Sequence, residues 1–215
     1  MKTWRTAKQT SGMTWIEILV VIFVIAVMAM MLLAVLANAK RKSSHLSCVS
    51  NLKEIGLSFQ IWEGDNGDKL PMQFAVTNSD MMKSISNGNS YVFWQTMSNE
   101  LSTPRILFCP EDTEHTEATN NFSTGFNDAN ISYFFNLDGN ETDPQMILAG
   151  DDNLLVNNVR VQSGILNFSA NNSVGWTKER HHGVGNIGLA DGSAQQVTSD
   201  GFKSALITTN RLVIP

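Results

Sequence analysis

The chain has 215 residues and a formal net charge of −5, with 42% hydrophobic and only 16% charged residues. This length suits one modest domain with additional segments. Because the chain is mildly acidic and has no basic run with interleaved aromatic residues, we do not expect it to bind nucleic acid. The charged fraction is below the usual quarter, which predicts a long uncharged stretch.

That stretch lies near the N-terminus, where Ile18–Ala37 is apolar throughout. It comprises about 20 residues and roughly 30 Å of helix, enough to cross a bilayer core. A buried helix of a soluble protein would normally keep a polar face. A signal peptide has a shorter apolar region followed by a small-residue cleavage site, for which Ala37–Ala39 is the nearest match. We therefore predict one transmembrane helix over residues 13–40.

The charges that flank this helix do not set its orientation. Three cations lie on each side, namely Lys2, Arg5 and Lys8 before it and Lys40, Arg41 and Lys42 after it. Because the number of cations is equal on the two sides, the positive-inside rule gives no orientation, which must come from another signal.

One carboxylate, Glu17, lies at the start of the otherwise uncharged helix. Insertion scales put the cost of an ionised carboxylate at the bilayer centre at about 2.5–3.5 kcal/mol, so such a residue usually has a partner. The alternative is a glutamate held in the headgroup layer by the helix macrodipole. Taken alone, Glu17 leaves both interpretations open.

The segment Gly12-Met13-Thr14-Trp15-Ile16-Glu17 follows a short basic leader and precedes the apolar stretch. This arrangement resembles the signature of type IV prepilins and type II secretion pseudopilins. The resemblance implies that a prepilin peptidase removes residues 1–12 by cutting between Gly12 and Met13, and that it methylates the new amine of Met13. It also implies that Glu17 binds the N-terminal amine of a neighbouring subunit. Many family members have a proline in this helix, whereas this chain has none between Met13 and Leu70, so a locally melted helix segment is not implied.

The resemblance also implies a location and a set of partners. The chain would be a single-pass inner-membrane protein with a cytoplasmic leader and a periplasmic C-terminal domain, and it would form an extracytoplasmic filament after assembly. Its partners would be the prepilin peptidase, other pilin or pseudopilin subunits in a helical assembly, and the inner-membrane assembly platform. Such a subunit is not an enzyme and needs no cofactor.

After the membrane segment, apolar residues recur at spacings of three and four: Leu46, Val49, Leu52, Ile55, Gly56, Phe59 and Trp62. This spacing predicts that the helix continues as an amphipathic helix over residues 41–63 and is ended by Gly64. A separate helix after a break near Lys40 is the alternative. The apolar stripe needs a cover, and a small antiparallel sheet packed on it would give an α+β, pilin-like fold.

Turn-forming residues follow this helix, and Asp65, Asn66 and Asp68 could supply oxygen ligands to calcium. Residues 51–71 resemble the corresponding part of major pseudopilins, which bind calcium in their C-terminal region. Since the spacing is not that of an EF-hand, we prefer a solvated turn and keep calcium as the alternative. Asp151-Asp152-Asn153 is a second acidic cluster, for which we also prefer a solvated turn.

Residues 64–215 are expected to form a β-rich globular domain, in which Asn, Ser, Thr and Gly separate short apolar runs. Each run predicts a strand or a short helix; the runs are 91–94, 106–108, 131–135 and 146–149. The two cysteines, Cys48 and Cys109, lack the spacing of a zinc site. A disulfide between them is permitted outside the cytoplasm, and closing a loop of about 60 residues would stabilise the fold by about 4 kcal/mol. Two buried free thiols are the alternative.

A second motif lies near the C-terminus. Asp191-Gly192 between two alternating runs predicts a hairpin near 181–198 with a type I′ turn and strands at 186–190 and 193–198. His181, followed after nine residues by Asp191-Gly192, resembles the H-X9-DG element of prepilin-like proteins, although the resemblance assigns no biochemical role. We prefer a structural role, in which His181 bonds the hairpin and Asp191 makes the turn. The alternative is a metal or catalytic site of His181, His182 and Asp191.

The expected function is therefore a structural subunit of a pseudopilus or pilus. A single-pass membrane-anchored periplasmic binding domain that does not assemble is the alternative, but it leaves Gly12 and Glu17 unexplained. A membrane-tethered hydrolase is not supported, because the sequence contains no G-x-S-x-G, H-E-x-x-H or phosphate-loop motif.

Overall fold

The computed structural model describes residues 12–116, 121–168, 172–206 and 211–215. Residues 1–11 of the predicted basic leader, with Lys2, Arg5 and Lys8, lie outside the described part. The chain divides into two compact units, Met1–Lys42 and Ser43–Pro215. Each unit is considered by itself below.

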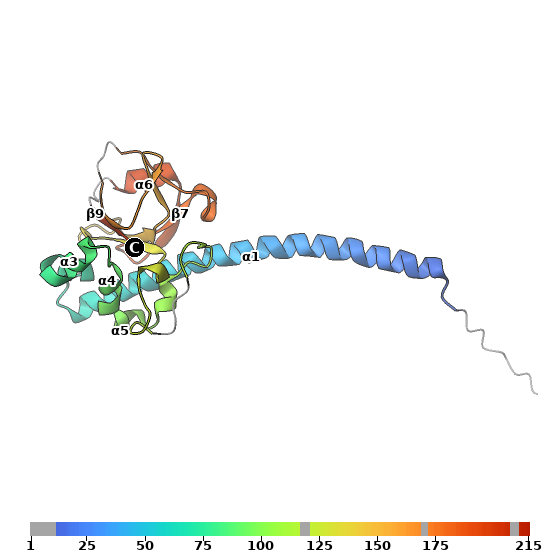
Figure 1. The fold of residues 1–215 in the computed structure, drawn as a ribbon, viewed down its shortest axis with the longest axis horizontal. Coiled ribbons are helices and arrows are strands. Elements are labelled where there is room, and N and C mark those ends of the chain that lie inside the picture. Colours follow the sequence, from blue (N-terminus) through green and yellow to red (C-terminus); the bar gives the residue numbers. More distant parts are fainter. Residues whose placement is uncertain (1–11, 117–120, 169–171, 207–210) are drawn as a thin grey trace, which may run out of the picture. The chain divides into compact units, whose positions relative to one another are not determined.

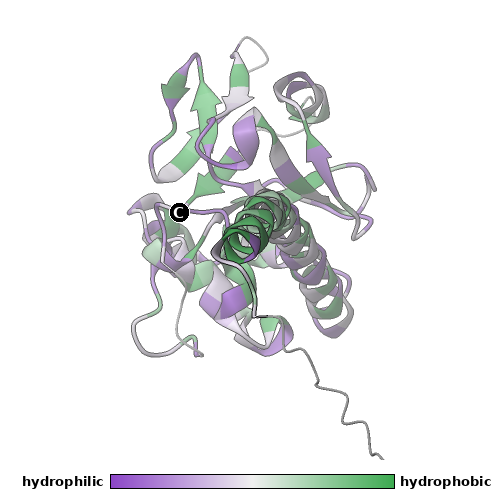
Figure 2. Cartoon of the chain, turned by 90° about the vertical axis from the view of Figure 1, so that its right-hand side faces the viewer, coloured by the Kyte–Doolittle hydropathy of each residue, from purple (hydrophilic) through white to green (hydrophobic). Residues whose placement is uncertain are grey.

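The first long element is helix α1, Trp15–Asp65 (Figure 1). It is a single helix, so the predicted continuation is confirmed and the alternative break near Lys40 is wrong. Its segment Trp15–Leu33 has a mean hydropathy of 3.0 and none of it is buried. Figure 2 shows this part of the helix as predominantly hydrophobic. By length and composition it could cross a membrane once, as the sequence predicts.

The C-terminal part of α1 buries one stripe of side chains, spaced by four and three residues: Cys48, Leu52, Ile55, Phe59 and Trp62. This is the amphipathic pattern predicted from the sequence, with one correction. Leu46 was expected on the stripe but is exposed, and Cys48 lies there instead, because spacings of four and three lead back from Leu52 to position 48. The helix ends at Asp65 rather than at Glu63, and the left-handed conformation falls on Gly67 and Asp68 rather than on Gly64.

Residues 71–107 form short helices, so the expectation that 64–215 is β-rich holds only from residue 133 onward. The helices are α2 (Pro71–Thr77), α3 (Ser79–Ser86), α4 (Tyr91–Thr96), α5 (Ser98–Leu101) and the 3-10 helix η1 (Pro104–Leu107). Pro71 occupies the first position of α2, where its missing N–H costs nothing. The Asn78 side chain accepts hydrogen bonds from two backbone N–H groups at the start of α3.

Two antiparallel sheets follow. The strands are β1 (Tyr133–Asn136), β2 (Ile147–Asp151), β3 (Leu154–Val156), β4 (Val159–Arg160), β5 (Gly164–Asn167), β6 (Val174–Trp176), β7 (Gly185–Leu189), β8 (Ala194–Val197) and β9 (Arg211–Ile214). Six of them pair in the order β5-β9-β1-β2-β7-β8, and three pair in the order β4-β3-β6. The remaining elements are η2 (Asp128–Asn130), η3 (His181–Gly183) and α6 (Ser199–Ala205). The architecture is α+β, as expected, but the sheet is larger than the small one predicted.

Both faces of the six-stranded sheet are buried at its central strands, and successive residues of β1 and β9 alternate between two cores. Tyr133, Phe135 and Val213 belong to one core, together with the buried stripe of α1 and residues of α3 and α4. Phe134, Leu212 and Ile214 belong to the other core, together with Trp176 and Phe202. Figure 1 accordingly shows α3, α4 and α5 on one side of the sheet and α6 on the other. Burial on both faces explains why these strands read as continuous apolar runs rather than as alternating ones.

Candidate functional site

The N-terminal motif begins outside the helix. Gly12 and Met13 precede α1 and are exposed, and a Cβ built on Gly12 would meet no atom within 4 Å. The Gly12–Met13 peptide bond therefore lies in non-helical, accessible backbone, which is the kind of segment that a protease can bind. The structure leaves the cleavage itself a prediction.

Glu17 has a partner within its own chain. Its Oε2 atom accepts hydrogen bonds from the Thr14 backbone N at 2.7 Å and from the Thr14 Oγ1 at 2.9 Å. The Thr14 Oγ1 in turn lies 3.4 Å from the Glu17 backbone N. This reciprocal arrangement is a capping box, and T-x-x-E is its sequence signature. Glu17 thus caps α1 in the single chain, a role that the sequence analysis did not assign to it.

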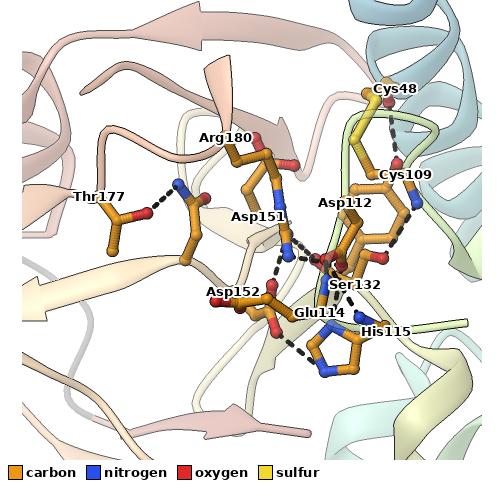
Figure 3. Close-up of polar contacts among 12 residues, drawn as sticks. Cys48, Cys109, Asp112, Glu114, His115, Ser132, Asp151, Asp152, Thr177 and Arg180 are labelled. Atoms are coloured by element: carbon orange, nitrogen blue, oxygen red, sulfur yellow. Dashed lines mark hydrogen bonds and ion pairs between the residues drawn. A yellow bond between two sulfur atoms is a disulfide. The ribbon is translucent and has the colours of Figure 1, made fainter. Parts of the chain in front are cut away.

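The predicted disulfide is confirmed. Cys48 and Cys109 are bonded to each other across a sequence separation of 61 residues, so the alternative of two free thiols is wrong. The bond joins the buried stripe of α1 to the segment that follows η1. Figure 3 shows it beside a group of polar side chains that belong to distant parts of the sequence.

At the centre of this group is the buried Arg180. Its Nη2 lies 2.5 Å from Asp112 Oδ2, and its Nη1 lies 2.5 Å from Asp152 Oδ1 and 3.0 Å from the Ser132 carbonyl oxygen. His115 contacts the same two carboxylates, with Nδ1 2.8 Å from Asp112 Oδ2 and Nε2 3.6 Å from Asp152 Oδ2 (Figure 3). We call these four residues, Asp112, His115, Asp152 and Arg180, the arginine cluster.

Burial and charge oppose each other in the arginine cluster. Burial alone would raise the pKa of Asp112, but the His115 hydrogen bond and the Arg180 charge lower it to about 2. Burial raises the pKa of Asp152, although Arg180 and His115 counteract it. Burial would lower the pKa of His115, but the two aspartates outweigh it and raise that pKa. The charges are thus balanced inside the domain, as buried ions require.

The prediction that Asp151-Asp152-Asn153 is a solvated turn is wrong, because all three residues are buried. Asp151 ends β2, and its Oδ2 accepts hydrogen bonds from the Asn186 backbone N at 2.7 Å and side-chain Nδ2 at 3.0 Å. Burial raises the pKa of Asp151 to about 7, with partial compensation from Arg180 and Asn186. This carboxyl group faces His181.

His181 is buried in η3, where three consecutive residues have positive φ: His181 (52°), His182 (57°) and Gly183 (87°). The His181 Nε2 lies 3.3 Å from Asp151 Oδ2 and 3.4 Å from Cys109 Sγ. Burial lowers its pKa to about 4. The preferred interpretation that His181 bonds the hairpin is therefore wrong: its imidazole contacts residues outside β7 and β8.

The alternative site of His181, His182 and Asp191 is also wrong. His182 and Asp191 are exposed, whereas His181 is buried. The Asp191 Oδ1 accepts a hydrogen bond from the Ser193 backbone N at 2.8 Å, which makes Asp191 a turn residue, as expected. The H-X9-DG element therefore separates into a buried histidine and an exposed turn.

The β7–β8 turn is not of type I′. Gly192 has a φ of 80°, but Asp191 is not among the residues with positive φ. The strands run over Gly185–Leu189 and Ala194–Val197, which leaves a loop of four residues in place of the predicted two. The positive φ of Gly192 favours glycine at this position, and a Cβ there would come within 3.0 Å of the amide end of the exposed Gln60 side chain of α1.

The proposed calcium ligands Asp65, Asn66 and Asp68 are exposed at the end of α1. The Asn66 Nδ2 donates to the Trp62 carbonyl oxygen at 2.9 Å, and the backbone N atoms of Asn66 and Asp68 donate to the Glu63 carbonyl oxygen at 3.2 and 3.0 Å. These hydrogen bonds account for the turn without an ion. Calcium binding here stays a prediction.

Comparison of the chain with models of protein families, with curated proteins and with solved structures gives no match.

Proposed function

We propose that this chain is a prepilin-like structural subunit: a prepilin peptidase cuts after Gly12, and the mature chain assembles through its apolar helix into a pilus or secretion pseudopilus. The observation that carries this proposal is the segment Trp15–Leu33, a helix that is apolar and wholly exposed in the single chain. Apolar surface is unfavourable in water by about 25 cal/mol per Å². The segment therefore needs a cover of lipid before assembly and of neighbouring helices after it.

Glu17 supports the assembly step. Within the described residues of the single chain, its carboxylate accepts hydrogen bonds from Thr14 of the same helix end. Cleavage after Gly12 would create an amine at Met13, which the Glu17 carboxylate of a neighbour staggered along the helix axis would bind. An amine and a carboxylate attract strongly in an apolar helix bundle, and each alone is costly to bury. One such pair for each subunit would fix the stagger between helices.

The Cys48–Cys109 disulfide supports the proposed location of the domain. Disulfides persist in oxidising compartments such as the bacterial periplasm and are rare in the cytoplasm. If the domain lies in the periplasm, one span of the inner membrane places the leader in the cytoplasm. The filament would be an open helical assembly, because a head-to-tail interface that does not close generates a fibre.

The first test is the mature N-terminus of the full chain, produced with an active prepilin peptidase and measured by mass spectrometry. We expect a chain that begins at N-methylated Met13, and a Gly12→Leu chain that keeps its leader. An intact leader on the unmodified sequence would contradict the proposal and would favour a single-pass anchored periplasmic domain. Cleavage near Ala39 would also contradict it, because the apolar segment would then be an ordinary signal sequence.

The second test separates the pairing role of Glu17 from its capping role. Glu17→Ala removes both roles, whereas Thr14→Ala removes the capping box and keeps the carboxylate. Glu54→Ala, an exposed glutamate on the same helix, is the matched control. We expect loss of filament incorporation for Glu17→Ala alone, with all three chains processed normally. Equal defects in Glu17→Ala and Thr14→Ala would show that Glu17 acts through the cap and would contradict pairing.

A further inference from the structure

We propose that His45, Glu111 and His181 form a binding site for one divalent transition-metal ion of the zinc type. The three residues come from different parts of the Ser43–Pro215 unit. His45 lies on α1, one turn before Cys48; Glu111 lies two residues after Cys109; and His181 lies in η3. The site goes beyond filament assembly, which needs no metal.

The distance between the two imidazole nitrogens fits a shared ion, and the Glu111 carboxylate, which lies at hydrogen-bond distance from one of them, would move outward to take the third position. The Nδ1 atoms of His45 and His181 face each other at 3.3 Å, and the Glu111 Oε2 lies 2.8 Å from the His181 Nδ1. All three ligand atoms lie within 4.8 Å of one another. Two nitrogens bound to zinc at about 2.0–2.1 Å with tetrahedral geometry are roughly 3.3–3.4 Å apart. The two imidazoles therefore have the separation that a common zinc ion would give them.

The hydrogen-bonding partners of His181 also favour an ion. Its Nε2 faces the buried Asp151 carboxyl group at 3.3 Å, and Asp151 is itself held by Asn186. A proton on Nε2 would donate to Asp151 and leave the Nδ1 lone pair directed at Glu111 and His45. Metal-binding histidines commonly donate their second ring N–H to a carboxylate in this way. A cation between the Nδ1 atoms and Glu111 would then satisfy all three acceptors.

A proton in place of a metal is the competing explanation. A doubly protonated His181 could donate to Glu111 and to Asp151 at the same time. The experiment below distinguishes the two, since a protonated histidine pair would bind no ion.

The surrounding structure holds the ligands in place before any ion binds. The Cys48–Cys109 disulfide fixes the helix that carries His45 against the segment that carries Glu111. His181 has a φ of 52°, a left-handed conformation that is uncommon outside glycine and is often found at functional sites. His45 is half-buried and the Glu111 side chain is 20% exposed, so an ion can enter and water can take a fourth position.

Two other groups of ligand-type side chains in the described residues are less suitable. In the arginine cluster, the guanidinium of Arg180 already contacts both Asp112 and Asp152, so a second cation would be repelled. The group Cys48, Cys109 and His181 has its two sulfur atoms bonded to each other and so offers no thiolate. Of these three groups among the described residues, the group of His45, Glu111 and His181 is the one that has three ligands without a competing cation or covalent bond.

The test is cobalt and zinc binding by the full chain, purified in detergent with its disulfide intact and stripped of metal with a chelator. Co²⁺ reports its coordination through visible absorption bands, and Zn²⁺ should displace it. We expect one bound ion for each chain and bands typical of four-coordinate cobalt. His45→Ala and Glu111→Gln should weaken binding at least about tenfold, the size of effect seen even for outer-shell partners.

Two histidine variants serve as controls, and circular dichroism checks that each chain is folded. His182→Ala changes an exposed histidine next to His181, and His115→Ala changes the histidine of the arginine cluster. Both should bind cobalt like the unmodified chain. The proposal is overturned by an absence of cobalt bands in the unmodified chain, by equal binding in His45→Ala and Glu111→Gln, or by loss of binding in His115→Ala. Binding only after reduction of the disulfide would also overturn it, since the thiols would then be the ligands.

Discussion

Two regions of this chain depart from the usual distribution of polarity in opposite directions. The helical segment Trp15–Leu33 exposes apolar side chains, whereas the arginine cluster buries charged ones. The arginine cluster contains its own partners, because each buried charge contacts an opposite charge of the same domain. The apolar segment is covered by none of the described residues of its unit. Buried charge with complete pairing therefore indicates a structural element, whereas unburied apolar surface indicates partners outside the chain.

The same contrast exists along α1. Ile55 and Phe59 are completely buried in its C-terminal part, while Ile22 and Phe23 are 58% and 69% exposed in its N-terminal part. Helical backbone hydrogen bonds are equally satisfied in both parts, so the difference lies in the surroundings that each part needs. Substituting a buried residue in one case and a matched exposed residue in the other can therefore test the contrast directly.

The largest expected effect is that of Arg180→Met. This change leaves Asp112 and Asp152 buried without their main counterion, which should lower the free energy of unfolding by roughly 3–5 kcal/mol. Arg211→Met is the control, because the Arg211–Asp138 pair is partly exposed and should contribute about 1 kcal/mol or less. Chemical unfolding of the full chain in detergent measures both. Equal effects would mean that the arginine cluster is not the balanced structural element described above.

A smaller effect is expected for Ile55→Ala. Removing this completely buried side chain from the core should cost about 3 kcal/mol, through lost burial and the cavity that remains. Ile22→Ala makes the same chemical change on the same helix, where the side chain is exposed, and should leave domain unfolding unchanged. A loss of more than about 1 kcal/mol for Ile22→Ala would show that the domain depends on the apolar segment.

The sequence was sufficient to predict the elements that rest on periodicity or on an uninterrupted apolar run. The apolar stretch of α1 and its amphipathic continuation were both recognisable, whereas for Cys48 and Cys109 the sequence left a disulfide and two free thiols equally open. Some local signals also indicate features that the periodicity does not. Pro71 and Asn78 are typical helix-start residues that indicate α2 and α3, and Thr14-x-x-Glu17 is a capping box.

The arginine cluster and the His45–Glu111–His181 group could not be predicted, because their members lie far apart in the sequence. Asp112, Asp152 and Arg180 come from three separate loops, and a charged residue in a loop is usually solvated. Only Asp151 and Asp152 gave a hint, since the apolar run 146–149 lies just before them and proved to belong to the buried strand β2, which ends at Asp151. The prediction that His181 acts together with the Asp191 turn was wrong for the opposite reason. Residues that are close in the sequence need not lie in the same surroundings.

The smallest expected effect concerns pH and His115. Burial opposes protonation of this imidazole, but Asp112 and Asp152 outweigh both burial and the Arg180 charge, so its pKa is raised in the folded chain. A raised pKa means that the protonated form stabilises the fold below the unfolded pKa of about 6.5 and that this stabilisation is lost as pH rises through the folded value. His115→Gln cannot titrate. The unmodified chain should therefore lose roughly 1 kcal/mol relative to His115→Gln between pH 6 and pH 9. Unfolding curves of both chains with chelator across this range provide the measurement. A constant difference would show that His115 is neutral in the cluster, and the buried charges would then have to be balanced by Arg180 alone.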